Sequence, residues 1–406
     1  SLTRIGIFEH FLDAKTVVAT GNGQSIYAIG CIDLRSAGPV VIEAPGGVLG
    51  FIISLWQQPL VDVGPLGPDK GEGGRFLLLP PGYSEDVPEG YFAVRSDTFL
   101  IHWVLRGFVK DGKPDAAVAS LKRMKIYPLA EQSDPPSMSF VDLSGRKAVL
   151  IPLGEDVEGL AYFGWMARFL QREPVREQDK VMLGMLAGLG IEKDKPFAPD
   201  ARTRAILTKA ARVGRAMTAT LAYETRAPNK LRWPGYSRWE ELLLSEHTDF
   251  VHPHYIELDA RAGLYYQAVG ASSKALSPWV GVGSKYAAAF KDSQGRWLIG
   301  SHRYRLRVPA NPPAKEFWSV TVYDAETRSM IANDRDISGR DSYQSSLKAN
   351  GDGSIDLYFA PSAPPGLQNN WIATQPGVGF FLYFRWYGPL EAYFDKSWRL
   401  PDVERM

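Results

Sequence analysis

The longest aromatic run of the chain offers the clearest candidate chemistry. Residues 380–387 are almost all aromatic or aliphatic apart from one arginine, and alternate residues of a β-strand point to opposite faces of a sheet. One face would carry Phe380, Leu382, Phe384 and Trp386, and the other Phe381, Tyr383, Arg385 and Tyr387. The first set is typical of a core. The second has polar tips, so it could serve domain packing or line a pocket for a planar or carboxylate-bearing molecule.

A glycine-rich loop supplies a second candidate. The segment 64–74 contains Asp69 and Lys70 among five glycines, and backbone N–H groups in such loops can approach an anion closely. It is not the phosphate-binding pattern Gly-x-x-x-x-Gly-Lys-Ser/Thr, because Gly71 follows the lysine. The segment is therefore either a turn-rich connection between strands or one wall of a binding cleft.

Histidine and cysteine give weaker signals. His252 and His254 are two residues apart, so on a strand they would point the same way and could share a metal ion, but Pro253 disturbs that geometry. Cys31 is the only cysteine and cannot form an internal disulfide. We interpret it as a small buried apolar residue of a strand, since thiol chemistry would need a nearby base that the sequence does not reveal. His102 is interpreted as an isolated structural histidine.

Composition narrows the classes of function. The chain has 46 Lys and Arg against 45 Asp and Glu, and nucleic-acid binders usually show a basic excess, so we expect no nucleic-acid partner. No apolar run has the length needed to cross a bilayer, so we expect no transmembrane segment. Nothing in the composition implies a cofactor.

The elements that must position these residues are mainly strands. Residues 1–150 read as strands and turns, with one short helix over 116–123. Helical periodicity follows over 160–170, 179–189 and a longer stretch that Asp200 can cap. The long helix has an apolar stripe of Ile206, Ala210, Val213, Met217 and Leu221, and its cations cover the remaining surface. From residue 263 onward strands return, with period-two alternation over 317–323 and 355–359.

Long strings of the N-terminal half resemble a bacterial family of proteins, the domain of unknown function 1254. They are Trp56-Gln57, Asp62-Val63-Gly64, the run Gly67-Pro68-Asp69-Lys70-Gly71-Glu72-Gly73-Gly74, and Leu77-Leu78-Leu79-Pro80-Pro81-Gly82-Tyr83. Relatives usually carry Asn-Asn-Asp-Thr-x-Tyr near the first strands. This chain has Gln24 at the carboxylate position of that motif, between Asn22 and Tyr27. Any chemistry of that carboxylate in relatives would be missing here. Relatives also begin with additional helical sequence before the stretch that corresponds to His10.

Strings of the C-terminal half resemble the partner family, the domain of unknown function 1214. They are the stretch 317–324 with Trp318 and Tyr323, the turn 350–356, Asn370-Trp371-Ile372, residues 385–391 beginning at Arg385, and Phe394-Asp395-Lys396-Ser397-Trp398. The resemblance implies an α+β, mainly β fold of two antiparallel β-sandwich-like domains with a helical segment between them. The expected ranges are 1–153, 154–245 and 246–406. Export signals among relatives point to a periplasmic or secreted protein, with the cytoplasm as the alternative.

Three functional hypotheses remain open at this stage. The first is an envelope hydrolase or lyase acting on a small organic molecule in an aromatic-lined pocket. The second is a non-catalytic ligand-binding or assembly protein, which could be a homo-oligomer, and the third is a metalloprotein using His252 and His254. The candidate catalytic residues are Tyr27, Lys70 and Tyr323, and the candidate ligand-binding residues are Asn22, Trp56, Asp69, Tyr83, Trp318 and Arg385.

Overall fold

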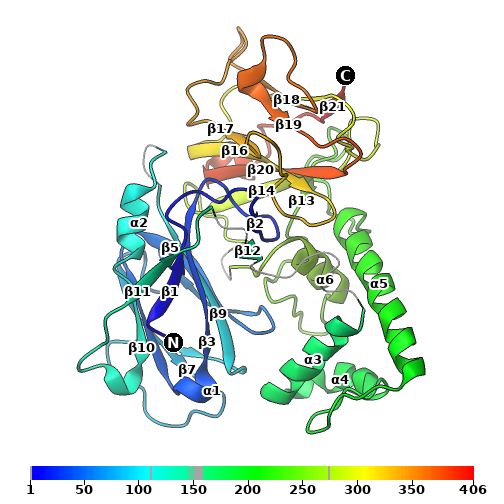
Figure 1. The fold of residues 1–406 in the computed structure, drawn as a ribbon. Helices are drawn as coiled ribbons and strands as arrows, with labels where there is room; N and C mark the ends of the chain where they lie inside the picture. Colours follow the sequence, from blue (N-terminus) through cyan, green and yellow to red (C-terminus); the bar gives the residue numbers. More distant parts are fainter. Residues whose placement is uncertain (1, 110–111, 146–147, 150–158, 273–274) are drawn as a thin grey trace.

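The predicted fold class is confirmed: the protein is α+β and mainly β, with two sandwiches and a helical segment (Figure 1). The computed structural model describes residues 2–109, 112–145, 148–149, 159–272 and 275–406. The predicted border between residues 153 and 154 therefore lies outside the described residues.

The N-terminal domain is a sandwich of two sheets. The described strands of the larger sheet run in the order β11 (Ser139–Asp142), β1 (Arg4–Ile7), β3 (Ile26–Asp33), β9 (Leu100–Gly107), β5 (Val48–Ser54) and β6 (Pro59–Val63). Those of the smaller sheet run β10 (Lys125–Pro128), β4 (Val40–Pro45), β7 (Gly73–Leu79) and β8 (Phe92–Arg95). The inward residues of both sheets form one apolar core that includes Ile26, Ile52, Phe76 and Trp103.

Short elements complete this domain. They are the pair β2 (Thr16–Val17) and β12 (Ala148–Val149), the helices α1 (Leu34–Ala37) and α2 (Asp115–Leu121), and the turn η1 (Leu129–Glu131). The inward side of β3 has a glycine at Gly30, where a Cβ would lie 2.6 Å from the Trp103 ring. The missing side chain leaves room for the indole within the core, so β3 and β9 can pair without a bulge.

The C-terminal domain is a second sandwich. Its larger sheet has the described strands β13 (Glu240–Glu241), β14 (Ser284–Ala289), β20 (Phe380–Pro389), β16 (Ala314–Asp324) and β17 (Gly339–Asp341). The smaller has β19 (Trp371–Ala373), β18 (Ile355–Ala360), β15 (Tyr304–Val308) and β21 (Glu404–Arg405). The helix α7 (Glu391–Phe394) and the turn η4 (Gln368–Asn370) flank them. Phe380, Leu382, Phe384 and Trp386 all lie in the core between these sheets, as the alternation along the strand predicts.

The helical segment lies between the two sandwiches in the chain. It comprises α3 (Leu160–Arg172), η3 (Glu177–Asp179), α4 (Lys180–Ala187) and α5 (Ala201–Tyr223), and α6 (Leu258–Gln267) packs against α5. Asp200 caps α5 as predicted, accepting a hydrogen bond of 2.7 Å from the Thr203 N–H. No helix of the described residues is long and apolar enough to cross a membrane.

The orientation of α5 differs from a simple core-facing helix. Leu207 and Ala222 are its buried residues, whereas Ile206, Val213 and Met217 of the apolar stripe are exposed by 52%, 49% and 63%. The reason is that α5 rests on α3 and α6 with the opposite side. Most of the apolar stripe therefore faces solvent.

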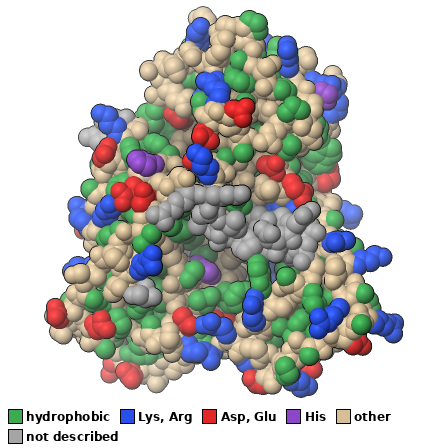
Figure 2. All heavy atoms as spheres, in the orientation of Figure 1, with side chains coloured by type: hydrophobic (Ala, Val, Ile, Leu, Met, Phe, Trp, Pro, Cys, Tyr) green, Lys and Arg blue, Asp and Glu red, His purple; other side chains and the backbone are tan. Residues whose placement is uncertain are grey.

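The two sandwiches meet through their larger sheets. Figure 1 shows the C-terminal domain above the N-terminal one, with the helices α3 to α6 beside the N-terminal domain and below the C-terminal one. An apolar cluster joins Phe8 and Leu12 of the N-terminal domain to Tyr323, Phe381 and Tyr383 of the C-terminal sheet. Figure 2 shows the surface hollowed between the N-terminal domain and the helical segment.

Candidate functional site

The candidate site lies on the face of the C-terminal sheet that meets the N-terminal domain. Strand pairing places Tyr286 of β14 and Ser319 of β16 on either side of Arg385 of β20. The next row holds Thr321 beside Tyr383. A sheet face is usually apolar where it is buried, so an arginine ringed by hydroxyl groups is a departure that needs an explanation.

Arg385 is 2% exposed and is held from both domains. Its guanidinium donates to Thr321 Oγ1 at 2.9 Å, to the Tyr323 hydroxyl at 2.5 Å and to the backbone carbonyl of Thr20 at 3.2 Å. It also lies over the rings of Tyr286, Tyr323 and Tyr383, 5.4 to 5.5 Å from each centroid. These contacts fix the cation in place without neutralising it.

A second arginine, Arg106, approaches the same group of tyrosines from the N-terminal domain. Arg106 of β9 is the direct cross-strand partner of Tyr27 of β3, and its charge acts on the Tyr286 phenol of the other domain. Arg106, Tyr27 and Tyr286 are each partly exposed, in contrast to Arg385. This side of the cluster therefore keeps contact with solvent.

The two arginines change the acidity of the phenol between them. Burial by itself would raise the pKa of Tyr286, but the charges of Arg106 and Arg385 and the hydrogen bonds from Arg106 and Ser284 outweigh it and lower that pKa. The pKa of Tyr27 and of Tyr323 is instead raised, chiefly by burial. Of these three phenols, Tyr286 is the one whose pKa is lowered from its ordinary value.

The described residues supply no acidic counterpart to the positive charge of the cluster. Within the described part of the chain, no carboxylate lies within ion-pair distance of Arg106 or Arg385. The Nε of Arg385 is buried and has no hydrogen-bond partner there. A buried guanidinium is costly unless it meets an anion, so the arrangement suits a carboxylate or another planar anion as ligand.

Four predicted site residues meet at this cluster: Asn22, Tyr27, Tyr323 and Arg385. Asn22 is buried and donates to the Tyr387 hydroxyl at 2.7 Å, which ties the segment before β3 to β20. The Tyr323 hydroxyl donates to the Gly21 carbonyl at 2.6 Å. Because Tyr323 is 0% exposed and its proton is engaged, it serves better as a fixed scaffold than as an acid.

Comparisons with known proteins support the resemblance. Residues 3–128 match the family described as "Protein of unknown function (DUF1254)", and residues 283–391 match "Protein of unknown function (DUF1214)". The chain belongs to these paired families. No curated protein matches it. The site lies where the DUF1254 and DUF1214 parts meet, since Tyr27 and Arg106 come from one and Tyr286 and Arg385 from the other.

A solved structure shows the same fold. The VPA0106 protein from Vibrio parahaemolyticus aligns with a TM-score of 0.56 at 20% identity, over 95% of this chain and 90% of that chain. An uncharacterized protein from Burkholderia cenocepacia aligns with a TM-score of 0.45 at 12% identity, over 100% of this chain and 82% of that one.

The glycine-rich loop of the DUF1254 part is built around Asp69. Its carboxylate is 5% exposed and accepts hydrogen bonds from the N–H groups of Gly64 at 2.8 Å and Gly73 at 3.3 Å. Burial raises its pKa, and these bonds oppose the rise. Lys70 is exposed, with a left-handed backbone φ of 50°. No described contact joins either residue to the arginine cluster, so the structure favours the turn-rich connection.

Three further predicted ligand-binding residues lie elsewhere. Trp318 is on the opposite face of the C-terminal sheet, stacked on Phe384 at 5.5 Å within the core. Tyr83 packs on the outer face of the smaller N-terminal sheet, in the cluster that contains Leu77. Trp56 precedes a turn at Gln57, whose carbonyl accepts a hydrogen bond from Tyr265 of α6. The sequence could not show that these three residues lie apart from the arginine cluster, because which strand face meets the other domain depends on tertiary packing.

The histidine pair does not form a metal-ligand set. His252 Nε2 lies 3.3 Å from Glu257 Oε1 and its ring contacts those of His247 and Tyr255, while His254 is exposed. The part of the chain that the structure describes holds no group of three His, Cys, Asp or Glu side chains arranged to bind a metal ion.

Sequence reasoning missed a thiol–imidazole pair on the outer face of the N-terminal sheet. Cys31 is exposed rather than buried, and its Sγ lies 2.9 Å from Nδ1 of His102 on the neighbouring strand. Partial desolvation by the neighbouring side chains raises the pKa of the Cys31 thiol and lowers that of the His102 imidazole, so both groups are neutral near pH 7. The two residues are 71 positions apart, and only the pairing of β3 with β9 reveals them.

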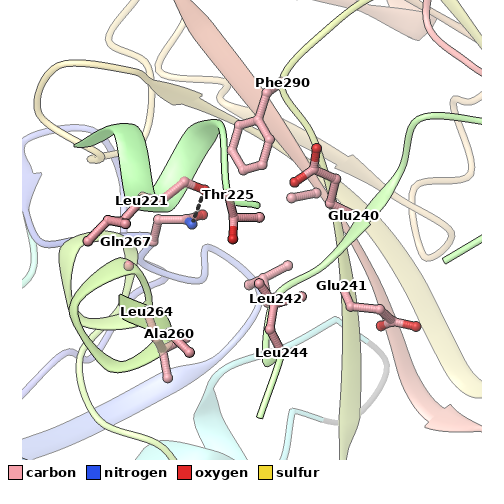
Figure 3. Close-up of a pocket in the computed structure, with 13 residues that line it drawn as sticks. Leu221, Thr225, Glu240, Glu241, Leu242, Leu244, Ala260, Leu264, Gln267 and Phe290 are labelled. Carbon is pink, nitrogen blue, oxygen red and sulfur yellow. Dashed lines mark hydrogen bonds between the residues drawn. The ribbon is translucent and has the colours of Figure 1, made fainter. Parts of the chain in front are cut away.

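A small cavity lies between α5, α6 and the C-terminal sheet (Figure 3). Its volume of about 20 Å³ holds about one water molecule, so it is too small for an organic substrate. Glu240 lines it near Phe290, while Glu241 points away (Figure 3). Burial raises the pKa of Glu240 to about 7, so the pKa of this carboxyl depends on how far water is excluded from it.

Proposed function

We propose that the arginine–tyrosine cluster between the two sandwiches binds a small carboxylate-bearing molecule and that the protein is a lyase acting on it. One observation carries the proposal: Arg106 and Arg385 flank Tyr286 and have no carboxylate partner among the described residues. A bound carboxylate would supply the missing negative charge, and the unpartnered Nε of Arg385 would donate to it.

The proposed chemistry is a proton transfer next to that carboxylate. Tyr286, deprotonated, removes a proton from the carbon beside the carboxylate, and the electron pair of the broken C–H bond moves toward the carboxylate oxygens. Arg106 and Arg385 stabilise the added negative charge. The pair then returns to form a carbon–carbon double bond while a leaving group departs from the adjacent carbon. Tyr286 retains the proton until it passes to solvent or to the leaving group.

Each other residue has a supporting part in this proposal. Tyr27 is partly exposed and keeps its proton, so it can donate a hydrogen bond to substrate. Tyr323 and Thr321 hold Arg385, and Asn22 holds Tyr387. The periplasmic location stays a prediction from the resemblance, and a homo-oligomeric state stays a prediction of the assembly hypothesis.

Calorimetric titration with a panel of small carboxylates tests the binding half of the proposal. We expect at least one to bind to the wild type, and Arg106→Gln to weaken that binding by at least about tenfold, because a charge-assisted hydrogen bond is lost. Arg307→Gln removes an exposed arginine of the smaller C-terminal sheet and is the matched control. Equal affinity of Arg106→Gln and wild type would refute the assignment of this cluster.

Product analysis tests the catalytic half. Elimination gives an unsaturated acid. Tyr286→Phe should abolish the formation of this acid, whereas the control Tyr236→Phe, at an exposed position, should leave its rate of formation unchanged. A hydrolase would instead give two products related by addition of water. Carboxylate binding with no turnover of any bound compound would favour the alternative, a non-catalytic ligand-binding protein.

A further inference from the structure

The solvent-facing side of α5 combines exposed apolar residues with cations. At 3.6 residues per turn, Ile206, Val213 and Met217 fall on one side of the helix, and all three are about half exposed or more. Arg202 and Lys209 border this stripe, four residues before and three after Ile206, and both are exposed. The helix is therefore amphipathic toward solvent as well as toward the protein.

The charge of α5 is entirely of one sign. Over its 23 residues it carries no aspartate or glutamate, and its cations are Arg202, Arg204, Lys209, Arg212 and Arg215. Arg215 turns inward to Glu326, but Arg202 and Lys209 have no ion-pair partner within the described residues. Figure 2 shows Lys and Arg side chains gathered along the edge of the molecule where Figure 1 draws α5.

We propose that this face of α5 docks the protein on the surface of an anionic lipid bilayer, with the helix lying in the plane of the interface. An in-plane helix presents an apolar side that enters the acyl boundary and cations that meet lipid phosphates, which matches the stripe and its border. The helix is about 35 Å long and lies at the periphery, so its whole length can lie along a flat surface (Figure 1).

Charge argues against a second copy of the chain as the occupant. Because α5 carries no aspartate or glutamate, a symmetric contact between two copies of this helix would gather the cations of both copies with no opposite charge from either helix, and like charges in one interface repel. An anionic membrane has the opposite sign and a fluid apolar layer at the right depth.

Vesicle co-sedimentation of the whole protein tests this inference. The probe is a vesicle of equal parts phosphatidylglycerol and phosphatidylcholine, compared with phosphatidylcholine alone. We expect binding to the anionic vesicle only, weakened by added salt. The double variant Arg202→Gln with Lys209→Gln should reduce the partition coefficient by about 25-fold, since each cation near an anionic surface contributes about fivefold.

Two further variants make the test decisive. Replacing Ile206, Val213 and Met217 with serine removes the apolar stripe and should lower partitioning at least tenfold. The control, Lys125→Gln with Arg303→Gln, removes the same charge from exposed positions of the two sandwiches and should bind like the wild type. Circular dichroism checks that each variant folds.

The proposal fails if the anionic vesicle does not bind, or if the control weakens binding as much as the α5 variants. It also fails if sedimentation velocity shows a dimer that the serine variant dissociates, because α5 would then be a contact between copies. Vesicle binding is measured without any substrate, so its outcome is independent of the proposed lyase activity.

Discussion

Substitution of Glu240 by glutamine should stabilise the protein near neutral pH and have little effect in acid. Glu240 lies on β13 at the edge of the cavity, its side chain is 13% exposed, and its nearest cation is Lys230 at 3.9 Å. Burial is the largest cause of its raised pKa, and the charge of Glu224 adds to it. Lys230 and Lys291 only partly offset these effects.

The magnitude follows from the pKa of Glu240 in the two states. The folded value is about 7 and the ordinary value is 4.5. At about 1.4 kcal/mol for each pKa unit, the difference corresponds to about 3 kcal/mol. Because the folded pKa is the higher one, the folded state binds more protons between pH 4.5 and 7. Stability is therefore lost as the pH rises through this window, and the loss is complete above about pH 7.

Urea unfolding at several pH values measures this effect. The free energy of unfolding of Glu240→Gln minus that of the wild type should be about 3 kcal/mol larger above pH 7 than at pH 4.5. The reason is that glutamine stays neutral at every pH, whereas Glu240 becomes charged as the pH rises. Glu131→Gln, an exposed site on the N-terminal domain, is the control and should follow the wild type. A constant difference across the pH range would show that Glu240 is not desolvated in the folded protein.

Three further predictions concern other parts of the fold. Glu173→Ala should lower the free energy of unfolding in urea by about 2 to 4 kcal/mol. The reason is that Glu173 is only 2% exposed and its carboxylate accepts hydrogen bonds from the N–H groups of Phe99 at 2.6 Å and Leu100 at 3.1 Å. An unchanged unfolding midpoint would contradict this. Gly50→Ala should cost about 3 kcal/mol in thermal unfolding, since its Cβ would lie 2.0 Å from a backbone oxygen of β9. Iodoacetamide should alkylate Cys31 more slowly than a free thiol at pH 8, because its raised pKa leaves less thiolate; equal rates would argue against that shift.

Periodicity in the sequence predicted the elements well, because it reports local geometry. The alternation along residues 380–387 separated core from polar face correctly, and Asp200 begins α5 by a hydrogen bond to a residue three positions away. These signals involve neighbouring residues and need no knowledge of tertiary packing.

The candidate site was only partly predictable, because it depends on pairing across domains. Arg385 and Tyr27 were named from the sequence, but Arg106 and Tyr286 were not, since neither stands in a recognisable motif. They become partners only when β9 and β14 face each other across the domain boundary.

The long helix shows the same limit. The apolar stripe containing Val213 is visible in the sequence, yet nothing local says whether protein or solvent covers it. The packing of α5 on α3 and α6 decides that question. In the same way, Cys31 and His102 meet only through the register of β3 with β9.

Anomalous diffraction from crystals soaked in p-bromobenzoate would locate a carboxylate bound at the arginine–tyrosine cluster. The compound is planar and carries one carboxylate, and its bromine marks the position. We expect the carboxylate to lie between the guanidiniums of Arg106 and Arg385, within hydrogen-bond distance of Arg385 Nε, and we expect no such density in crystals of Arg106→Gln. Bromobenzoate bound at full occupancy only away from these two arginines would contradict the proposed site. The same density in the Arg106→Gln crystals would contradict it as well.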